Sequence, residues 1–276
     1  MIELHSPRAS AIIDPVTGGR LVSLVIDGHE VIGAVPTVKE IVRKGQAAEH
    51  DWYRGSFPLA PWAGALREGT FVFDGTTHHV QLDSAGTAKH GVVAERPWDI
   101  EETLDQTSAI LSIQFGPDFP GRWPFSAGAV QSFVLEESAL LMRLEVHSSE
   151  PRMPAIAGFH PWFRSQLNDG ATASITFLPS SKLTYREGIL VADDELGSRP
   201  WDNAFVGLAE PPVISWAGGP RLRLESDASV WVYYETLPGA FCIEPWTGPF
   251  EGLETKWSSV VTPDEPLVLN FTIWFD

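Results

Sequence analysis

Short runs of alternating apolar and polar residues dominate the chain, and most of them end at Gly, Pro, Asn or Asp. A period of two residues is typical of a strand with one face in a core. Residues 20–27 form such a run and end at Gly28, and residues 267–275 form another near the end of the chain. Residues 70–73 lead into Asp74-Gly75, a strong hairpin signal, so we expect a second strand to continue to residue 82.

The remaining alternating runs predict further strands and hairpins, whereas helical spacing is scarce. They cover residues 109–115, 129–135 with 139–146, 173–178, and 221–225 with 230–235. Glu136, Glu137 and Ser138 would form the turn between residues 129–135 and 139–146. Strands joined by short turns, without intervening helices, favour antiparallel sheets packed face to face. The sequence therefore predicts an all-β fold, an antiparallel β-sandwich.

The distribution of residues along the chain gives no sign of a domain boundary. No internal repeat is evident, and the 24 glycines and 22 prolines are spread along the chain without a concentrated linker. At 276 residues and 43% hydrophobic character, the chain can bury a large core in one sandwich. We expect a single domain over residues 1–276.

Charge and cysteine content narrow the choice of partners and compartment. Lys and Arg number 19 against 36 Asp and Glu, a net charge of −17, and such a surface repels phosphate backbones and anionic lipids. No apolar stretch approaches the ~20 residues of a membrane span, and no secretory signal is evident near Met1. Cys242 is the one cysteine, which excludes an internal disulfide. We expect a cytoplasmic monomer or homodimer that binds neither nucleic acid nor membranes.

Motifs for several common chemistries are missing from the sequence. There is no GxGxxG or GxxxxGK[ST] for a nucleotide, no HExxH for zinc and no GxSxG for a nucleophilic serine. His78 and His79 are adjacent on an expected strand, so their side chains point to opposite faces and cannot both reach one ion. We expect surface or packing roles for both, and no metal site.

Four polar residues stand out because they lie in aromatic, Pro-rich and Gly-rich surroundings: His90, His160, Asp202 and Glu244. Glu244 ends an apolar strand beside Trp246, where partial desolvation would raise its pKa towards neutrality. The imidazole of His160 can change protonation near pH 7. An acid, a base and aromatic rings suit a sugar, whose C–H faces pack on rings while its hydroxyls need hydrogen bonds.

Each of these residues also has an ordinary structural interpretation. A His or Glu at a strand end is commonly solvated or bonded to nearby backbone, and Asp202 fits a turn-capping residue equally well. The aromatic clusters taken alone fit a hydrophobic core better than a ligand platform. Composition and spacing leave these alternatives open.

The order of several motifs resembles the aldose 1-epimerase (galactose mutarotase-like) family. The segment 53–64 (YRGSFPLAPWAG), followed by Arg67-Glu68-Gly69, resembles the family's Pro-Trp segment, and His90-Gly91 resembles its HG motif. Residues 158–163 (GFHPWF) resemble its GxHPYF motif. Asp202 with Phe205 resembles the late aspartate segment, and residues 243–249 (IEPWTGP) resemble the glutamate segment. The resemblance extends from about residue 21 to the final strand.

This resemblance implies a galactose mutarotase-like supersandwich that interconverts the anomers of a free aldose without a cofactor. Glu244 would be the base for the anomeric hydroxyl, and His160 would be the acid for the ring oxygen. His90 would hydrogen-bond the ring oxygen or a neighbouring hydroxyl, and Asp202 would hold hydroxyls at the far side of the ring. Trp162 and Trp246 would provide the aromatic platform.

The chain departs from the family pattern at Ala65, where relatives carry an arginine that grips sugar hydroxyls. On a strand Arg67 would share a face with Ala65, so we include it among the expected sugar-binding residues, although it corresponds to a second, surface-type basic residue of the pattern. We therefore expect weak sugar binding, or a sugar without the hydroxyl that the arginine contacts. The alternatives are a sugar-binding protein with little turnover, a hexose-6-phosphate mutarotase, and a polysaccharide-cleaving enzyme, for which the chain is short.

Overall fold

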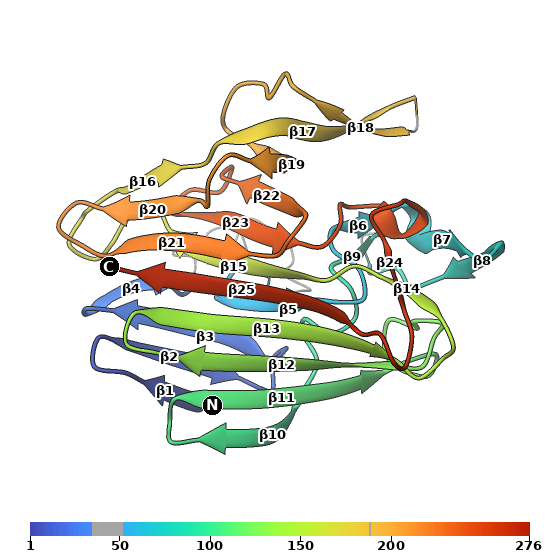
Figure 1. The fold of residues 1–276 in the computed structure, drawn as a ribbon, viewed down its shortest axis with the longest axis horizontal. Coiled ribbons are helices and arrows are strands. Elements are labelled where there is room, and N and C mark those ends of the chain that lie inside the picture. The colour runs from blue at the N-terminus through green and yellow to red at the C-terminus, as the bar shows by residue number, and fades with distance from the viewer. Residues whose placement is uncertain (35–51, 85, 188) are drawn as a thin grey trace.

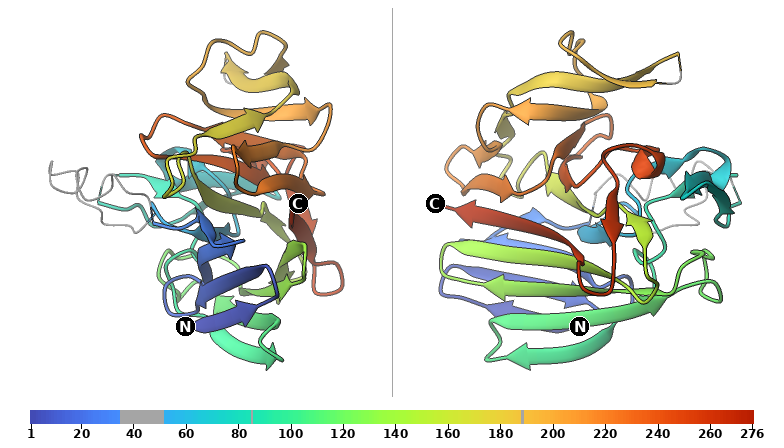
Figure 2. Two further views of the ribbon diagram at one scale, coloured as in Figure 1. Left: turned by 90° about the vertical axis from the view of Figure 1, so that its left-hand side faces the viewer. Right: turned by 45° about the vertical axis from the view of Figure 1, so that its right-hand side comes forward.

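The computed structural model describes residues 1–34, 52–84, 86–187 and 189–276. Within these residues, two large antiparallel sheets of 11 and 8 strands stack as a sandwich, which Figure 1 shows from its broad side and Figure 2 from other directions. The two edges made by β1 and β10 lie together near the N-terminus, and β16 to β20 lie at the opposite end (Figure 1). The predicted all-β sandwich is confirmed.

The larger sheet runs in the order β1-β2-β3-β4-β15-β23-β22-β19-β17-β18, with β5 beside β15 and β3. Its strands are β1 (Ile2–His5), β2 (Ala9–Asp14), β3 (Arg20–Ile26), β4 (His29–Ile32), β5 (Ser56–Leu59), β15 (Gly158–Arg164), β17 (Pro179–Arg186), β18 (Ile189–Asp193), β19 (Asp202–Leu208), β22 (Val230–Tyr234) and β23 (Ala240–Trp246).

The smaller sheet runs in the order β10-β11-β12-β13-β25-β21-β20-β16. Its strands are β10 (Asp99–Leu104), β11 (Ser108–Phe115), β12 (Ala127–Leu135), β13 (Ala139–Ser148), β16 (Ala173–Thr176), β20 (Val213–Trp216), β21 (Arg221–Ser226) and β25 (Leu267–Phe275).

Three two-stranded ladders and two 3₁₀ helices complete the described elements. They are β6 (Ala65–Leu66) with β9 (Ala88–Lys89), β7 (Thr70–Phe73) with β8 (Thr76–His79), β14 (Met153–Ala155) with β24 (Ser259–Val261), η1 (Arg67–Gly69) and η2 (Gly252–Glu254). No helix in the described ranges has the length and apolarity that a bilayer span requires.

The strands follow the alternating pattern closely where one face is buried. β11 and β25 alternate between buried and more exposed positions over most of their length, and β7 turns into β8 through Asp74-Gly75 as expected. β12 and β13 pair through the turn at residues 136–138. β8 ends at His79, three residues before the predicted end, and the His78 ring packs on Phe71 with ring centroids 5.2 Å apart.

The expected pairing of residues 221–225 with residues 230–235 is wrong. β21 pairs with β20 and β25 in the smaller sheet, whereas β22 pairs with β19 and β23 in the larger one. The chain crosses from one sheet to the other between them. The alternating pattern identifies both strands, but strand pairing depends on contacts between segments that are far apart in the sequence.

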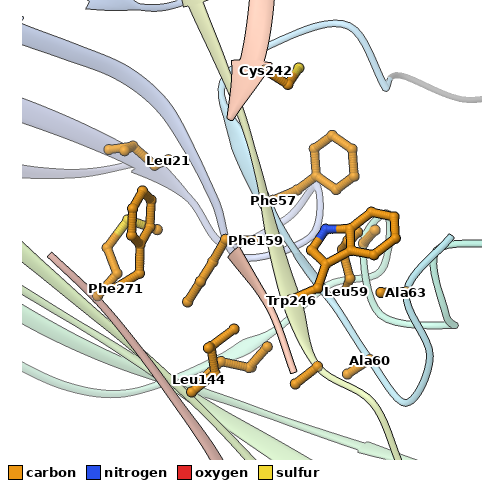
Figure 3. Packing of buried hydrophobic residues seen from close by; sticks show 14 of the residues in the cluster. Leu21, Phe57, Leu59, Ala60, Ala63, Leu144, Phe159, Cys242, Trp246 and Phe271 are labelled. Atoms are coloured by element: carbon orange, nitrogen blue, oxygen red, sulfur yellow. The ribbon is translucent and has the colours of Figure 1, made fainter. Parts of the chain in front are cut away.

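The core between the sheets is built from large apolar side chains of both. The rings of Phe159 on β15 and Phe271 on β25 lie 5.9 Å apart between centroids, and both side chains are fully buried. Figure 3 shows Phe159 with Leu144 and Phe271 on one side of β15, whereas Phe57 and Trp246 lie on its other side. The larger sheet therefore has two covered faces, one towards the smaller sheet and one beneath a layer of aromatic residues.

We expect Phe271→Ala to lower the free energy of unfolding by about 3–5 kcal/mol, because it leaves a cavity between the sheets. Denaturant unfolding followed by tryptophan fluorescence measures the change. Val134→Ala on β12, where the side chain is 37% exposed, is the control and should stay within about 1 kcal/mol of the wild type. Equal effects of the two substitutions would show that the Phe271 ring does not carry this packing.

Candidate active site

A cavity of about 370 Å³ opens on the face of the larger sheet that points away from the smaller one. Its residues come from β15, β23, β22 and β19, from the β6/β9 ladder and from the segment before β5. The lining residues are Trp52, Tyr53, Gly64, Ala65, Lys89, His90, His160, Trp162, Asp202, Asn203, Ala204, Val232, Tyr234, Glu244, Trp246 and Phe250.

Strand register brings the expected acid and base together. Gly158 pairs with Trp246 and Trp162 with Cys242, so His160 and Glu244 lie directly opposite each other on β15 and β23. Side chains two residues apart on a strand share a face, so Trp162 and Trp246 flank the pair on the same side of the sheet. His160, which precedes Glu244 by 84 positions in the sequence, thus meets it through antiparallel pairing.

The carboxylate and the imidazole are close and almost completely buried. The Nε2 atom of His160 lies 3.6 Å from Oε1 of Glu244, and the two residues are 8% and 2% exposed. The indole Nε1–H of Trp246 donates a hydrogen bond of 3.2 Å to Oε2 of Glu244. The pair can therefore exchange a proton with a ligand in the cavity while bulk water is largely excluded.

Burial moves the two pKa values in opposite directions. It raises the pKa of Glu244 well above its usual value. The hydrogen bond from Trp246 acts in the opposite direction but is the smaller effect. Burial also lowers the pKa of His160 well below its usual value, with help from the nearby His90 and Arg20. Both shifts favour the uncharged form, since each charge loses its water.

The ring of His160 is held from behind by Phe57 of β5. The two residues are register partners, and their rings stack with centroids 4.7 Å apart and planes 22° apart. The guanidinium of the fully buried Arg20 also lies over the Phe57 ring, 4.6 Å from its centroid. This arrangement fixes the imidazole plane and places a positive charge behind it, which disfavours imidazolium.

His90 reaches the cavity through a left-handed turn directly after β9. Its φ is 60° and that of Gly91 is 76°, and a Cβ atom at Gly91 would lie 1.9 Å from the carbonyl oxygen of Ala60. Only glycine fits there, which gives the His-Gly pair a physical reason. The His90 ring lies edge-on to His160, with centroids 5.2 Å apart, and to Trp52, with centroids 4.8 Å apart.

Gly158 is required for a different reason. A Cβ atom at this position would come within 2.6 Å of the Trp246 ring, because the two residues are directly paired across β15 and β23. The glycine therefore makes room for the indole that donates to Glu244. It explains why a glycine precedes the Phe-His-Pro segment.

Asp202 lies at the start of β19, on the side of the cavity away from His160. Its neighbour across the ladder is Tyr234, which is itself paired with Cys242 of β23. Partial burial raises the pKa of Asp202, and the charge of Lys89 opposes that shift. The structure thus brings His90, His160, Asp202, Glu244, Trp162 and Trp246 to one cavity.

The structure does not bring Arg67 into this cavity. The strand that would have carried it ends at Leu66, and Arg67 begins the turn η1, in which Glu68 has a φ of 52°. Its guanidinium instead pairs with Glu251 at 3.0 Å and is 67% exposed, in a separate hollow beside Tyr185. The shared face with Ala65 assumed an extended chain, and that premise is wrong. Ala65 itself does line the cavity.

The described residues contain one group that could hold a metal ion. Ligand atoms of His160, Cys242 and Glu244 lie within 4.8 Å of one another, all buried. Burial also raises the pKa of the Cys242 thiol well above its usual value, and a protonated thiol is a poor ligand. The donors therefore fit an acid–base site better than a metal site.

The sequence interpretation did not single out Trp52, Tyr234 or Lys89 as site residues, although they line the cavity. Trp52 precedes the Pro-Trp segment, and its carbonyl accepts a 2.5 Å hydrogen bond from the Trp162 indole. Tyr234 reaches the cavity because its strand, β22, pairs with β23. Lys89 directly precedes the His-Gly turn, and this adjacency was the one signal that could have identified it.

The family model described as aldose 1-epimerase matches residues 1–203. The fold is similar to that of a galactose mutarotase-like protein from Clostridium acetobutylicum, with a TM-score of 0.81, 16% identity, and coverage of 99% of this chain and 94% of that one.

Two further solved structures show the same fold. A galactose mutarotase-like protein from Lactobacillus casei has a TM-score of 0.78 and 15% identity, with 100% of both chains covered. A galactose 1-epimerase from Lactobacillus acidophilus has a TM-score of 0.75 and 15% identity, with 99% of this chain and 93% of that one covered. No curated protein sequence matches the chain.

The hydrogen bond from Trp246 predicts a measurable pKa change. We expect Trp246→Phe to raise the pKa of Glu244 further, because a donated N–H stabilises the carboxylate and phenylalanine cannot donate one. A ¹³C NMR titration of the labelled glutamates measures the shift, and the missing resonance in Glu244→Gln assigns the signal. An unchanged or lower pKa would show that this hydrogen bond does not act on the carboxylate.

Proposed function

The chain belongs to the aldose 1-epimerase family, and on that premise we propose that it interconverts the α and β anomers of a free aldose by acid–base ring opening and closure. The observation that carries the proposal is the buried His160–Glu244 pair, 3.6 Å apart, at the floor of a cavity of about 370 Å³. A pyranose can lie in a cavity of this size with its ring edge against the pair.

The proton transfers balance over one cycle. Glu244 removes the proton of the anomeric hydroxyl while His160 gives a proton to the ring oxygen, so that the C1–O5 bond breaks and an aldehyde forms. Rotation about the C1–C2 bond exposes the other face of the aldehyde to the freed hydroxyl. On closure, Glu244 returns its proton to the carbonyl oxygen and His160 recovers one from the attacking hydroxyl.

Burial of the pair supports this cycle energetically. In the first state, before ring opening, Glu244 is a carboxylate and His160 is an imidazolium. In the second state, beside the open aldehyde, Glu244 is a carboxylic acid and His160 is a neutral imidazole. Attraction at 3.6 Å favours the first state, and loss of water from both groups favours the second, as the pKa shifts indicate. The two opposing terms reduce the difference in free energy between the states, which keeps the reaction reversible in both directions.

The remaining cavity residues would position the sugar. His90, beside His160, would bond the ring oxygen or a neighbouring hydroxyl, and Asp202 would accept hydroxyl protons across the cavity. Trp162 and Trp246 are only 3% and 4% exposed, yet both contribute to the cavity wall, where their rings can pack against the C–H face of a sugar.

A second candidate is a sugar-binding protein of the same fold with little turnover, and Ala65 favours it. The methyl group lines the cavity where the family pattern has an arginine, so one charge-assisted contact to the sugar is missing. A hexose-6-phosphate mutarotase has less support, because Asp202 shares the cavity with Glu244 and would repel a phosphate. Polarimetry of freshly dissolved α-D-glucose, α-D-galactose and several pentoses separates turnover from binding alone.

We expect Glu244→Gln to reduce catalysed mutarotation by about 100-fold or more, because the amide keeps the shape of the side chain and loses its basicity. Polarimetry measures the rate, and circular dichroism checks the fold. Glu251→Gln, which removes the partner of Arg67 outside the cavity, is the matched control and should keep the wild-type rate. A Glu244→Gln rate within about 3-fold of the wild type would exclude Glu244 as the base.

The two histidines should differ in kinetics. We expect His160→Asn to lower kcat more than it raises KM, since it removes a transferred proton. His90→Asn should change both, because it removes a contact to the sugar, and asparagine tolerates the positive φ at this position. Steady-state polarimetry over a range of sugar concentrations gives both constants. Identical changes in kcat and KM for the two variants would contradict this division of roles.

A further inference from the structure

Lys89 is the one lysine or arginine among the described residues that line the cavity. Its side chain is exposed, and that side chain makes no hydrogen bond or ion pair within the part of the chain that the structure describes. Its ammonium is therefore available to a ligand. The basic residue expected at the cavity from the sequence, Arg67, is instead held by Glu251.

The position of Lys89 follows from the small β6/β9 ladder. Ala65 and Lys89 are direct register partners, so their side chains leave the ladder on the same side, next to each other. Both line the cavity, and the following residue in the chain is His90. The small methyl group of Ala65 leaves space into which the long side chain of Lys89 can extend.

Lys89 also faces a group of opposite charge. Asp202 lines the same cavity, and the positive charge of Lys89 opposes the rise that partial burial causes in the pKa of its carboxyl group. A donor with three N–H groups and an acceptor with two oxygens thus share one cavity. Neighbouring sugar hydroxyls need this combination, because each hydroxyl both donates and accepts.

We propose that Lys89 is the residue that binds and selects the sugar, donating to a hydroxyl oxygen of a neutral aldose while Asp202 accepts a proton from a neighbouring hydroxyl. The inference rests on the proposed function and deepens it by naming the recognition group and the substrate class. A neutral sugar fits better than an acidic one, because the carboxylates of Asp202 and Glu244 line the same cavity and would repel a second anion.

The test is Lys89→Met in the full chain, followed by polarimetry with α-D-glucose and α-D-galactose and by calorimetric sugar titration. The variant keeps an unbranched side chain that is one atom shorter and loses the charge. We expect KM and the dissociation constant to rise about 10- to 100-fold, with kcat within about 3-fold of the wild type, because the contact is made in both ground and transition states.

Three further variants sharpen the test. Lys89→Arg should keep KM within a few-fold of the wild type. Ala65→Arg combined with Lys89→Met should recover part of the lost affinity, because the new guanidinium starts from the neighbouring position on the ladder. Lys256→Met is the matched control, since this lysine packs over Trp257, outside the cavity, and it should change neither constant.

The outcomes separate this inference from the proposed function. An active wild type with an unchanged KM in Lys89→Met would overturn the inference and leave mutarotation standing. If the wild type turns over no aldose, the proposed function fails, and calorimetry decides the inference: weaker sugar binding in Lys89→Met supports it, and equal or absent binding overturns it. Faster turnover of glucose 6-phosphate or glucuronate than of glucose, lost in Lys89→Met, would overturn the assignment of a neutral sugar.

Discussion

The candidate site depends on one constraint, the burial of a carboxylate and an imidazole side by side on adjacent strands. Water cannot stabilise either charge there, so the two groups compensate each other or become neutral. Their 3.6 Å separation supplies compensation, and the Trp246 indole retains some preference for the carboxylate. A pair held between these two states can give and take protons with little change in free energy. An exposed carboxylate would be a weaker base, and an exposed imidazolium would be a weaker acid.

The surrounding structure maintains this burial. β15 and β23 lie in the middle of the larger sheet, and their alternate side chains, such as Phe159, pack against the smaller sheet. The cavity side is closed by Phe57 behind His160 and by the turn at His90, which glycine at position 91 permits. Because strands and packed rings move little, the distance between acid and base is set by the register of the sheet.

The sequence allowed the fold and most of the candidate site to be predicted, for different physical reasons. Alternation marks strands such as β25 because one face of each is buried, and the polar residues Glu244 and His160 stood out among aromatic neighbours. Pairing is a non-local property, so the separation of β21 and β22 into two sheets was not predictable from local pattern. The prediction that Arg67 lies at the cavity was wrong for a local reason, because the turn at Glu68, with its positive φ, interrupts the assumed strand.

The proposed binding of the sugar by Lys89, in place of an arginine at position 65, would have a consequence for selectivity. A guanidinium presents a rigid planar fork that matches one arrangement of oxygens, whereas an ammonium is a compact charge on a flexible stem that can follow several. Asp202, held in register with Tyr234 of β22, would remain at a fixed position, and Lys89 would adjust to the neighbouring hydroxyl in either orientation. Such a cavity would bind one hexose less tightly. It would also accept epimers that differ at the carbon whose hydroxyl contacts Lys89. In the proposed function, the acid–base pair would set the reaction, and the lysine would determine how many sugars undergo it.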